Sequence, residues 1–143
     1  MSITAYDYTA NISIINYCTP ELTASCIDSI IASNTKASLH ITIVDNASTD
    51  DSVTKLRDYV ASQGALLPIT LVESPVNGGF SAGHNIGVQT VSASFHVLLN
   101  SDTRVMPGAL DHLVAAAAEN TEAGLVVPCL VSENGEVQQS RFR

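Results

Sequence analysis

Residues 11–22 read NISIINYCTPEL, a short β-branched run that passes directly into a helix signal. Branched residues of this kind favour a strand. Thr19 then offers an N-cap, and Pro20 stands at the first helical position, where proline is well tolerated. Apolar residues recur at helical spacing over 22–31, and this pattern ends near Asn34. The stretch therefore predicts one strand followed at once by one helix.

The same alternation continues along the rest of the chain. Near-continuous apolar strands that alternate with amphipathic helices are typical of a parallel sheet with helices on both faces, which is an open α/β fold. Asn134-Gly135 predicts a hairpin turn before a polar terminal strand. The other strands are predicted at 11–17, 39–46, 69–74, 95–100 and 124–131, and helices after Thr19, from Ser48, within 75–91 and from Pro107.

The length and composition are those of one globular domain. The chain has 143 residues, 45% hydrophobic and 14% charged, so a single domain over 1–143 is predicted. The formal net charge is −8 and the six Lys and Arg residues are scattered, which argues against nucleic acid as a partner. The three cysteines lack CxxC spacing, which argues against a zinc site or a disulfide framework.

No targeting signal is visible in the sequence. The first residues, MSITAYDYTAN, lack the positive and apolar regions of a signal peptide. There is also no uncharged apolar run of about 18 residues that could span a bilayer. A cytoplasmic location is predicted, and a peripheral contact with the inner face of the membrane stays open.

Polar residues follow the predicted strands. In open α/β sheets, ligands bind beyond the carboxyl ends of the strands, near the point where the strand order reverses. We therefore expect the site at that edge. The residues there are Asn16-Tyr17 after the first strand, Asp45-Asn46 after the second, Asn77-Gly78-Gly79 after the third, and Asn100-Ser101-Asp102 after the fourth.

Asp45 follows an apolar strand directly and has two interpretations. A carboxylate only accepts hydrogen bonds, so it could receive a ring N–H or a ribose hydroxyl. Alternatively, Asp45 organises the turn together with Asn46 and Ser48. Ser48 and Asp51 match the spacing of a capping box, which is expected to leave Asp45 free for a ligand.

The segment NGGFSAGHNIG, residues 77–87, is rich in glycine, but its spacing matches neither GxGxxG nor the P-loop. Glycines here would let the backbone approach a ligand, and Asn85 adds an amide that can donate and accept. The alternative is a tight turn with close packing of a helix on the sheet. Among the four histidines, His84 is kept as a candidate because it lies inside this segment.

Asp102 is a hard oxygen ligand at a strand end, and Asn100 points to the same side of an extended segment. One carboxylate does not complete a metal cage. Mg²⁺ and Mn²⁺, however, commonly keep waters and take one or two carboxylates plus the oxygens of a diphosphate. Such an ion would also neutralise a diphosphate that this acidic chain has few cations to meet. The alternative is that Asp102 begins a turn before Pro107.

Four motifs in order, ISIINY, IVDNASTDDS, NGGFSAGHNIG and LLNSDT, resemble the donor-binding half of an inverting family 2 glycosyltransferase with the GT-A fold. The resemblance covers about residues 11–131. Within that family the chain is most similar to the rhamnosyltransferase group that builds bacterial surface polysaccharides. The resemblance implies a GT-A, Rossmann-like, mainly parallel sheet.

The resemblance also implies ligands and site residues. The donor would be a nucleotide-diphospho-sugar, with dTDP-rhamnose favoured and UDP- or GDP-sugars as alternatives, and the acceptor a glycan or lipid-linked glycan. The cofactor would be Mg²⁺ or Mn²⁺. Asn16 and Tyr17 would line the nucleobase site, and Asp45 would bind the base or the ribose. Gly79, Gly83 and Asn85 would shape the nucleotide side of the cleft, and His84 would neutralise a phosphate. Asn100 and Ser101 would form the floor of the diphosphate site, and Asp102 would bind the metal.

The chain departs from the family pattern in two places. Asn100 stands where many relatives carry the first aspartate of a DxD motif. Relatives supply the general base downstream, whereas this sequence ends at QQSRFR, so the base is expected beyond Arg143 and the chain alone is expected to be inactive. A non-catalytic nucleotide-sugar-binding or scaffold module remains an alternative. A nucleotidyltransferase is disfavoured, because that class is expected to carry a glycine-rich loop with basic residues directly after the first strand. The segment NYCTPEL at that position contains no glycine and no Lys or Arg.

Overall fold

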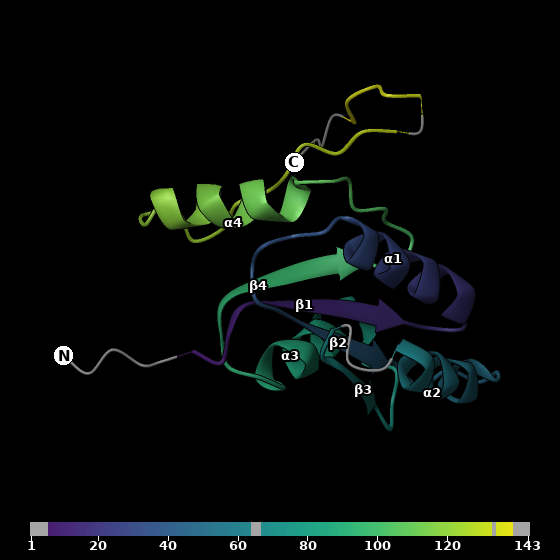
Figure 1. Ribbon diagram of the computed structural model, residues 1–143. Coiled ribbons are helices and arrows are strands. Elements are labelled where there is room, and N and C mark those ends of the chain that lie inside the picture. The colour runs from purple at the N-terminus through teal and green to yellow at the C-terminus, as the bar shows by residue number, and fades with distance from the viewer. Residues whose placement is uncertain (1–5, 64–66, 133, 139–143) are drawn as a thin grey trace.

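Strands and helices alternate through most of the chain in the computed structural model, which describes residues 6–63, 67–132 and 134–138 (Figure 1). The first four predicted strands and all four predicted helices are confirmed. Within the described residues, no helix is long and apolar enough to cross a membrane. The elements are β1 (Tyr8–Asn16), α1 (Pro20–Ala32), β2 (Leu39–Asp45), α2 (Ser52–Gln63), β3 (Ile69–Glu73), α3 (Gly79–Gln89), β4 (Ala93–Asn100) and α4 (Ala109–Glu119).

The four strands form one parallel sheet in the order β3-β2-β1-β4. The chain moves outward from β1 through β2 to β3, and then returns to the other side of β1 to add β4. The strand order therefore reverses between β1 and β4. In the register of this sheet, Asn16 pairs with Asp45 and Ile15 with Asn100, so three strand ends lie at one edge. This is the edge at which open α/β sheets bind ligands.

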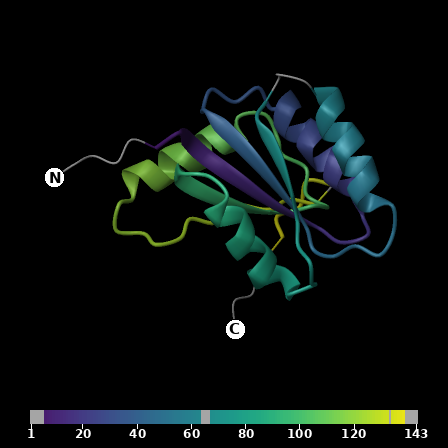
Figure 2. The same ribbon diagram turned by 90° about the horizontal axis from the view of Figure 1, so that it is seen from below.

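One face of the sheet carries the apolar core. Ile12 and Ile14 of β1 and Ile41 and Ile43 of β2 have no exposed surface, and they pack in one cluster with residues of α1, α2 and α4. Figures 1 and 2 show α1 and α2 on the side of the sheet opposite α3. Successive strand side chains point to opposite faces, so the even-numbered residues of β1 fix this face as the core.

The other face of the sheet is polar, and α3 covers it. Asn11 links three elements there: its Nδ2 donates to the carbonyl of Gly87 at 2.9 Å, and its Oδ1 accepts from Thr42 Oγ1 at 2.9 Å. Asn11 and Thr42 are both fully buried. Buried polar groups of this kind are costly unless they are paired, so these bonds tie α3 to one position on β1 and β2.

Two glycines let α3 lie against the sheet. A Cβ on Gly83 would lie 2.9 Å from Ile15 Cδ1, and one on Gly87 would lie 2.1 Å from Ser13 Oγ. Both separations are shorter than real Cβ contacts, so a side chain at either position would force a neighbour to move. The flexible end of Ile15 can move away from Gly83, whereas Ser13 leaves no room at Gly87. Close packing of helix on sheet, the alternative considered for this segment, is what these two glycines provide.

The predicted fifth strand at 124–131 is wrong. Residues 124–130 have no regular secondary structure, and Leu125 and Val127 are 75% and 50% exposed. An isolated antiparallel bridge joins Val131 to Val137 around the predicted turn at Asn134-Gly135, in place of a terminal strand. A strand needs a partner for its backbone groups, and Pro128 lacks one of the N–H donors for pairing.

Candidate functional site

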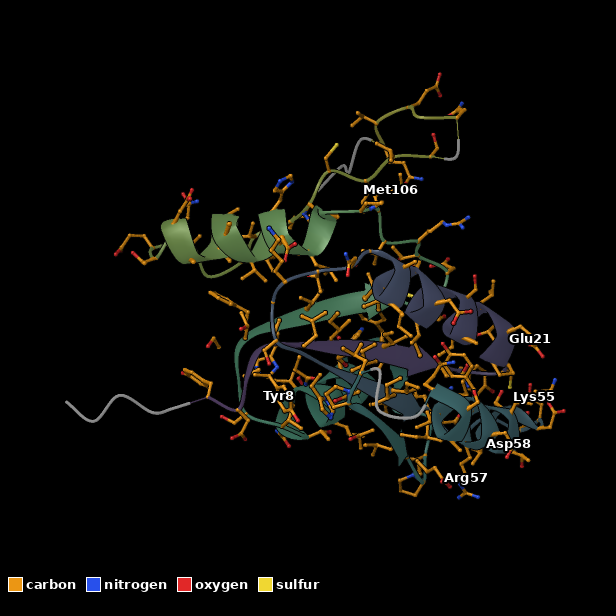
Figure 3. The ribbon with its side chains drawn as sticks, viewed as in Figure 1. Tyr8, Glu21, Lys55, Arg57, Asp58 and Met106 are labelled. Carbon is orange, nitrogen blue, oxygen red and sulfur yellow. The ribbon has the colours of Figure 1, made fainter. Side chains whose placement is uncertain are left out.

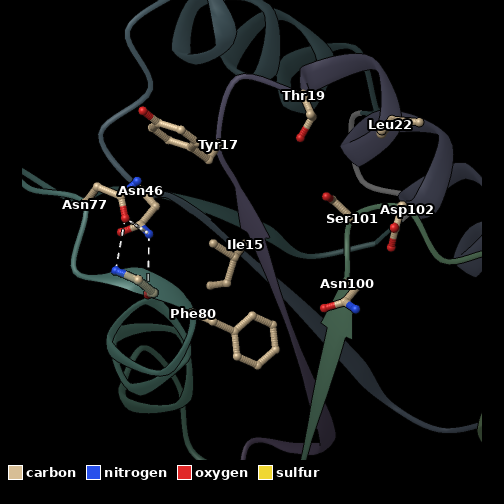
Figure 4. A pocket seen from close by; sticks show the side chains of 11 residues that line it. Ile15, Tyr17, Thr19, Leu22, Asn46, Asn77, Phe80, Asn100, Ser101 and Asp102 are labelled. Atoms are coloured by element: carbon tan, nitrogen blue, oxygen red, sulfur yellow. Dashed lines mark hydrogen bonds between the residues drawn. The ribbon is translucent and has the colours of Figure 1, made fainter. Parts of the chain in front are cut away.

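A cavity of about 380 Å³ opens at the carboxyl ends of β1 and β4, at the point where the strand order reverses (Figure 4). It combines two aromatic rings, several amides and one carboxylate. Pockets of this kind, largely apolar with a few polar groups, are typical ligand sites. The cavity is lined by Ile15, Tyr17, Thr19, Leu22, Asn46, Asn77, Gly79, Phe80, Asn100, Ser101 and Asp102.

The cavity brings together half of the residues predicted from the sequence. Tyr17, Gly79, Asn100, Ser101 and Asp102 line it. Asn46 and Asn77 also line it; the sequence places both at the expected edge but assigns them no role. The other lining residues, among them Phe80, were missed. Phe80 lies inside the glycine segment, but no pattern in the sequence distinguishes an exposed phenylalanine from a buried one.

Asn16 and Asp45 lie beneath the cavity, with 0% and 1% exposure. Asn16 Nδ2 donates to Asp45 Oδ2 at 2.7 Å, and Ser48 Oγ donates to the same oxygen at 2.7 Å. Asp45 Oδ1 accepts from the backbone N–H of Ser48 at 2.9 Å. The Asp45 carboxylate is therefore engaged by the protein itself, which is the arrangement of a turn-organising aspartate.

The expected capping box at Ser48 and Asp51 is wrong. Helix α2 begins at Ser52, and the backbone N–H of Ser52 donates to Asp50 Oδ1 at 3.0 Å. Ser48 instead binds Asp45, so it does not leave that carboxylate free. Spacing alone did not distinguish among the Ser, Thr and Asp residues of this turn, all of which can bind a backbone N–H at a helix start.

The Asp45 network holds two strained corners of the backbone. Cys18 and Ala47 have φ values of 54° and 60°, which non-glycine residues adopt at a cost of about 1–3 kcal/mol each. The N–H of Cys18 donates to Ser48 Oγ at 2.9 Å, and Ala47 lies inside the turn closed by Asp45. The residues just before these corners, Tyr17 and Asn46, line the cavity. The buried network thus sets where the cavity side chains lie.

The glycine-rich segment reaches the site mainly through its first residues. Gly79 has φ of 81°, a left-handed conformation that suits glycine, and it starts α3 with Phe80 directed into the cavity (Figure 4). Gly83 and His84 are buried against the sheet, and Asn85 is exposed on α3; none of these three lines the cavity.

His84 is a buried polar residue between α3 and β1. Its Nδ1 is 2.9 Å from Ser13 Oγ, and the Phe80 ring meets it edge-on with centroids 4.4 Å apart. Its Nε2 has no hydrogen-bond partner among the described residues. Burial lowers the pKa of His84, because a desolvated imidazolium is less stable than the neutral ring. A neutral ring at this position does not supply positive charge to a phosphate.

The lowered pKa predicts a pH dependence of folding. In the unfolded chain His84 takes up a proton below its ordinary pKa of about 6.5, whereas the folded state resists it. The free energy of unfolding should therefore be fully retained above that pH and fall below it, by no more than about 1.4 kcal/mol per pH unit for one proton. Urea unfolding at pH 7.5 and 5.5 measures this loss.

The matched comparison for this prediction is His84→Gln against His112→Gln, since His112 is exposed on α4. Burial also lowers the pKa of His40 and His96, so the His84 variant should lose part of the pH dependence and retain the rest. Equal pH dependence in the wild type and the His84 variant would contradict the assignment.

Asp102 is the residue of the cavity that could hold a metal ion. Its side chain is exposed, Asn100 and Ser101 add oxygens nearby, and the described residues contain no cluster of three or more His, Cys, Asp or Glu that could form a closed cage. One carboxylate with neutral oxygens fits Mg²⁺ or Mn²⁺, which keep waters and accept diphosphate oxygens. These residues therefore fit a metal that is held jointly with a ligand.

Lys and Arg side chains do not supply positive charge among the described residues that line the cavity. Lys55 on α2 pairs with Glu21 at 2.7 Å and Asp51 at 3.1 Å, and Arg57 pairs with Glu73. Figure 3 labels Lys55 and Arg57 on α2, and neither is among the residues that line the cavity. An anion in this cavity would therefore find no Lys or Arg side chain among these lining residues, and a cation held by Asp102 could supply positive charge there.

The sequence matches one family model, that of glycosyl transferase family 2, over residues 12–143. No curated protein matches it at a significant level. Among solved structures, the mannosyltransferase PcManGT from Pyrobaculum calidifontis, in complex with GDP-Man and Mn²⁺, is similar with a TM-score of 0.70 and 22% identity. S. aureus TarS residues 1–349 give a TM-score of 0.66 and 17% identity, also in a complex with UDP-GlcNAc.

These likenesses confirm the α/β GT-A-like fold. The alignments cover 80% of this chain for PcManGT and 79% for TarS 1–349, but 33% of each of those chains. The matched part of this chain therefore spans about a third of the length of the structures it is similar to.

Proposed function

Because the chain belongs to glycosyl transferase family 2, we propose that its cavity binds a nucleotide-diphospho-sugar, whose sugar is transferred with inversion to an acceptor glycan. The observation that carries this proposal is the position of the cavity between β1 and β4. There an aromatic ring, side-chain amides and a carboxylate meet at one opening. These groups match, in kind, a planar base, a ribose and a diphosphate.

The roles follow from the chemistry of each side chain. Tyr17 is 47% exposed at the end of β1 and offers a flat apolar surface on which a nucleobase can stack. Asn100 and Ser101 offer donors and acceptors to the ribose and the diphosphate. Asp102 would hold Mg²⁺ or Mn²⁺, and such an ion supplies neutralising charge to the departing diphosphate.

Asn16 and Asp45 act through the residues they position. The base or ribose contact expected for Asp45 is replaced in our proposal by a positioning role, because its carboxylate binds Asn16 and Ser48 and is 1% exposed. Gly83 serves in the same indirect way, since it allows α3 to pack where its first turn reaches the cavity.

The transfer step also needs a base that removes the proton of the acceptor hydroxyl. Among the described residues that line the cavity, Asp102 is the one carboxylate, and a carboxylate that binds metal is not free for this task. We propose that the base is supplied from outside the residues that line this cavity. The chain of 143 residues on its own should then bind the donor and fail to transfer the sugar.

The favoured donor is dTDP-rhamnose, on the basis of the motif resemblance, with a cytoplasmic glycan or lipid-linked precursor of a surface polysaccharide as acceptor. The similar structures named above hold UDP-GlcNAc and GDP-Man. UDP- and GDP-sugars are therefore the comparison ligands for any test of the donor.

Thermal unfolding with nucleotides tests this function. We expect dTDP, UDP or GDP with MnCl₂ at about 100 times its dissociation constant to raise the melting temperature by roughly 5–10 °C, since such binding adds about 2.7 kcal/mol. Asp102→Ala should remove the metal-dependent part of that rise and leave the ligand-free melting temperature unchanged. No stabilisation by any of these nucleotides would refute nucleotide-sugar binding, and a metal response that survived in Asp102→Ala would remove Asp102 from the site.

A further inference from the structure

The amide of Asn77 has a fixed orientation at the edge of the cavity. Asn46 Oδ1 accepts from the backbone N–H of Gly78 at 3.3 Å, and Asn46 Nδ2 donates to the carbonyl of Gly79 at 3.4 Å. Because one of these backbone groups is a donor and the other an acceptor, they determine which atom of the Asn46 side-chain amide is the oxygen and which is the nitrogen. Asn46 Nδ2 also donates to Asn77 Oδ1 at 2.8 Å, so the oxygen of Asn77 must face Asn46.

A second donor fixes the same orientation. The backbone N–H of Gly79 donates to Asn77 Oδ1 at 3.0 Å. Both acceptor positions of that oxygen are then used, and Nδ2 is the group that Asn77 has left to offer. Among the described residues, Asn77 Nδ2 has no protein partner, and the side chain is exposed. Asn46 differs, because it is 3% exposed and both ends of its amide are bound.

Two aromatic rings line the same cavity as this amide. Figure 4 shows the Tyr17 ring beside the Asn46–Asn77 pair and the Phe80 ring across the opening from it. They are 47% and 55% exposed, which is a large apolar area left in water. Rings in such a position are stabilised when a planar ligand covers them. A base placed against them would present its polar edge to Asn77.

We propose that Asn77 is the residue that selects the nucleobase, through a hydrogen bond from Nδ2 to a ring carbonyl. The inference rests on the proposed nucleotide-sugar function and names the base class of the donor. Uracil, thymine and guanine carry a carbonyl oxygen where cytosine and adenine carry an amino group. A fixed N–H donor on Asn77 favours uracil, thymine and guanine, because their carbonyl oxygen accepts the hydrogen bond. With cytosine or adenine, the amino group of the base and the Asn77 amide would be two donors facing each other.

The matched ligands for a test are UDP and CDP, which share the ribose and the diphosphate and differ at the 4-position and the adjoining ring nitrogen. Calorimetric titration at constant MnCl₂ should show UDP binding at least about tenfold more tightly than CDP. Dissociation constants within twofold of each other would overturn the inference. If no nucleoside diphosphate binds, the proposed function fails, and the inference fails with it.

Asn77→Asp is the decisive variant, because its carboxylate still accepts from Asn46 Nδ2 and Gly79 N–H and replaces only the outward donor by an acceptor. The ratio of UDP to CDP affinity should fall by about tenfold or more and approach or pass equality. The added negative charge repels both diphosphates alike and cancels in this ratio. An unchanged ratio would overturn the inference.

Two further variants separate the loss of the donor from the added charge. Gln89→Glu adds the same charge at the exposed far end of α3 and should keep the wild-type ratio. Asn77→Ala removes the donor without adding an acceptor, so its ratio should lie between those of the wild type and Asn77→Asp. A base preference that survives in Asn77→Ala would place the selecting group elsewhere.

Discussion

Replacing Asp45 with alanine should lower the free energy of unfolding by about 3 kcal/mol and abolish nucleotide binding at the same time. The carboxylate accepts three hydrogen bonds, from Asn16 Nδ2, Ser48 Oγ and the N–H of Ser48. Its removal leaves buried donors without this acceptor, and such losses cost about 1–3 kcal/mol per group. The cost of burying the Asp45 side chain away from water also disappears in the variant, and this offsets part of the loss.

Binding should fail together with stability because Asp45 holds the backbone on which cavity residues stand. The left-handed corners at Cys18 and Ala47 depend on Ser48 and Asp45, and without them Tyr17 and Asn46 lose their positions. Urea unfolding monitored by circular dichroism measures the first effect, and titration with dTDP or UDP measures the second.

Asp58→Ala is the control, since Asp58 is exposed on α2 (Figure 3) and its loss should change stability by at most about 0.5 kcal/mol. An Asp45→Ala variant that folds as stably as the wild type and has merely lost its affinity would contradict the positioning role. It would support the direct ligand contact expected from the sequence.

Replacing Gly87 with alanine should destabilise the protein by about 3 kcal/mol, because the added methyl group has no room. Its carbon would lie 2.1 Å from Ser13 Oγ and 2.9 Å from Ser13 Cβ. Ser13 belongs to the central strand β1 and also contacts His84 at 2.9 Å, so it has little freedom to move away. Helix α3 must shift instead, and that shift breaks the bond from Asn11 Nδ2 to the Gly87 carbonyl.

The effect should reach the cavity, because Gly79 and Phe80 at the start of α3 line it. Melting temperature and nucleotide affinity should therefore both fall in Gly87→Ala. A graded series tests the cause. Gly83→Ala should cost less, since its methyl group meets the flexible end of Ile15 at 2.9 Å, and Gly124→Ala should be neutral because nothing lies within 4 Å. Equal melting temperatures across the three variants would contradict this packing argument.

Much of the site could be predicted because strand ends in a parallel sheet meet at one edge. The sequence places Tyr17, Asn100 and Asp102 at such ends, and all three line the cavity. The sequence indicates Asp45 by its position after a strand and His84 by its place in the glycine-rich segment, but both side chains bind other groups of the protein. Nothing in the sequence distinguishes a carboxylate that binds its own turn from one that binds a ligand.

The sequence by itself determined the order of strands and helices and the polar edge, because hydrophobic period and turn chemistry act over a few neighbouring residues. The tertiary structure alone decided which polar side chains stay free. The backbone groups of Gly78 and Gly79 bind both ends of the Asn46 amide and the oxygen of Asn77, so Asn46 is fully engaged and Asn77 has its Nδ2 left to donate. It also left residues 124–130 without regular secondary structure, since a strand forms only where a partner supplies the other half of its hydrogen bonds.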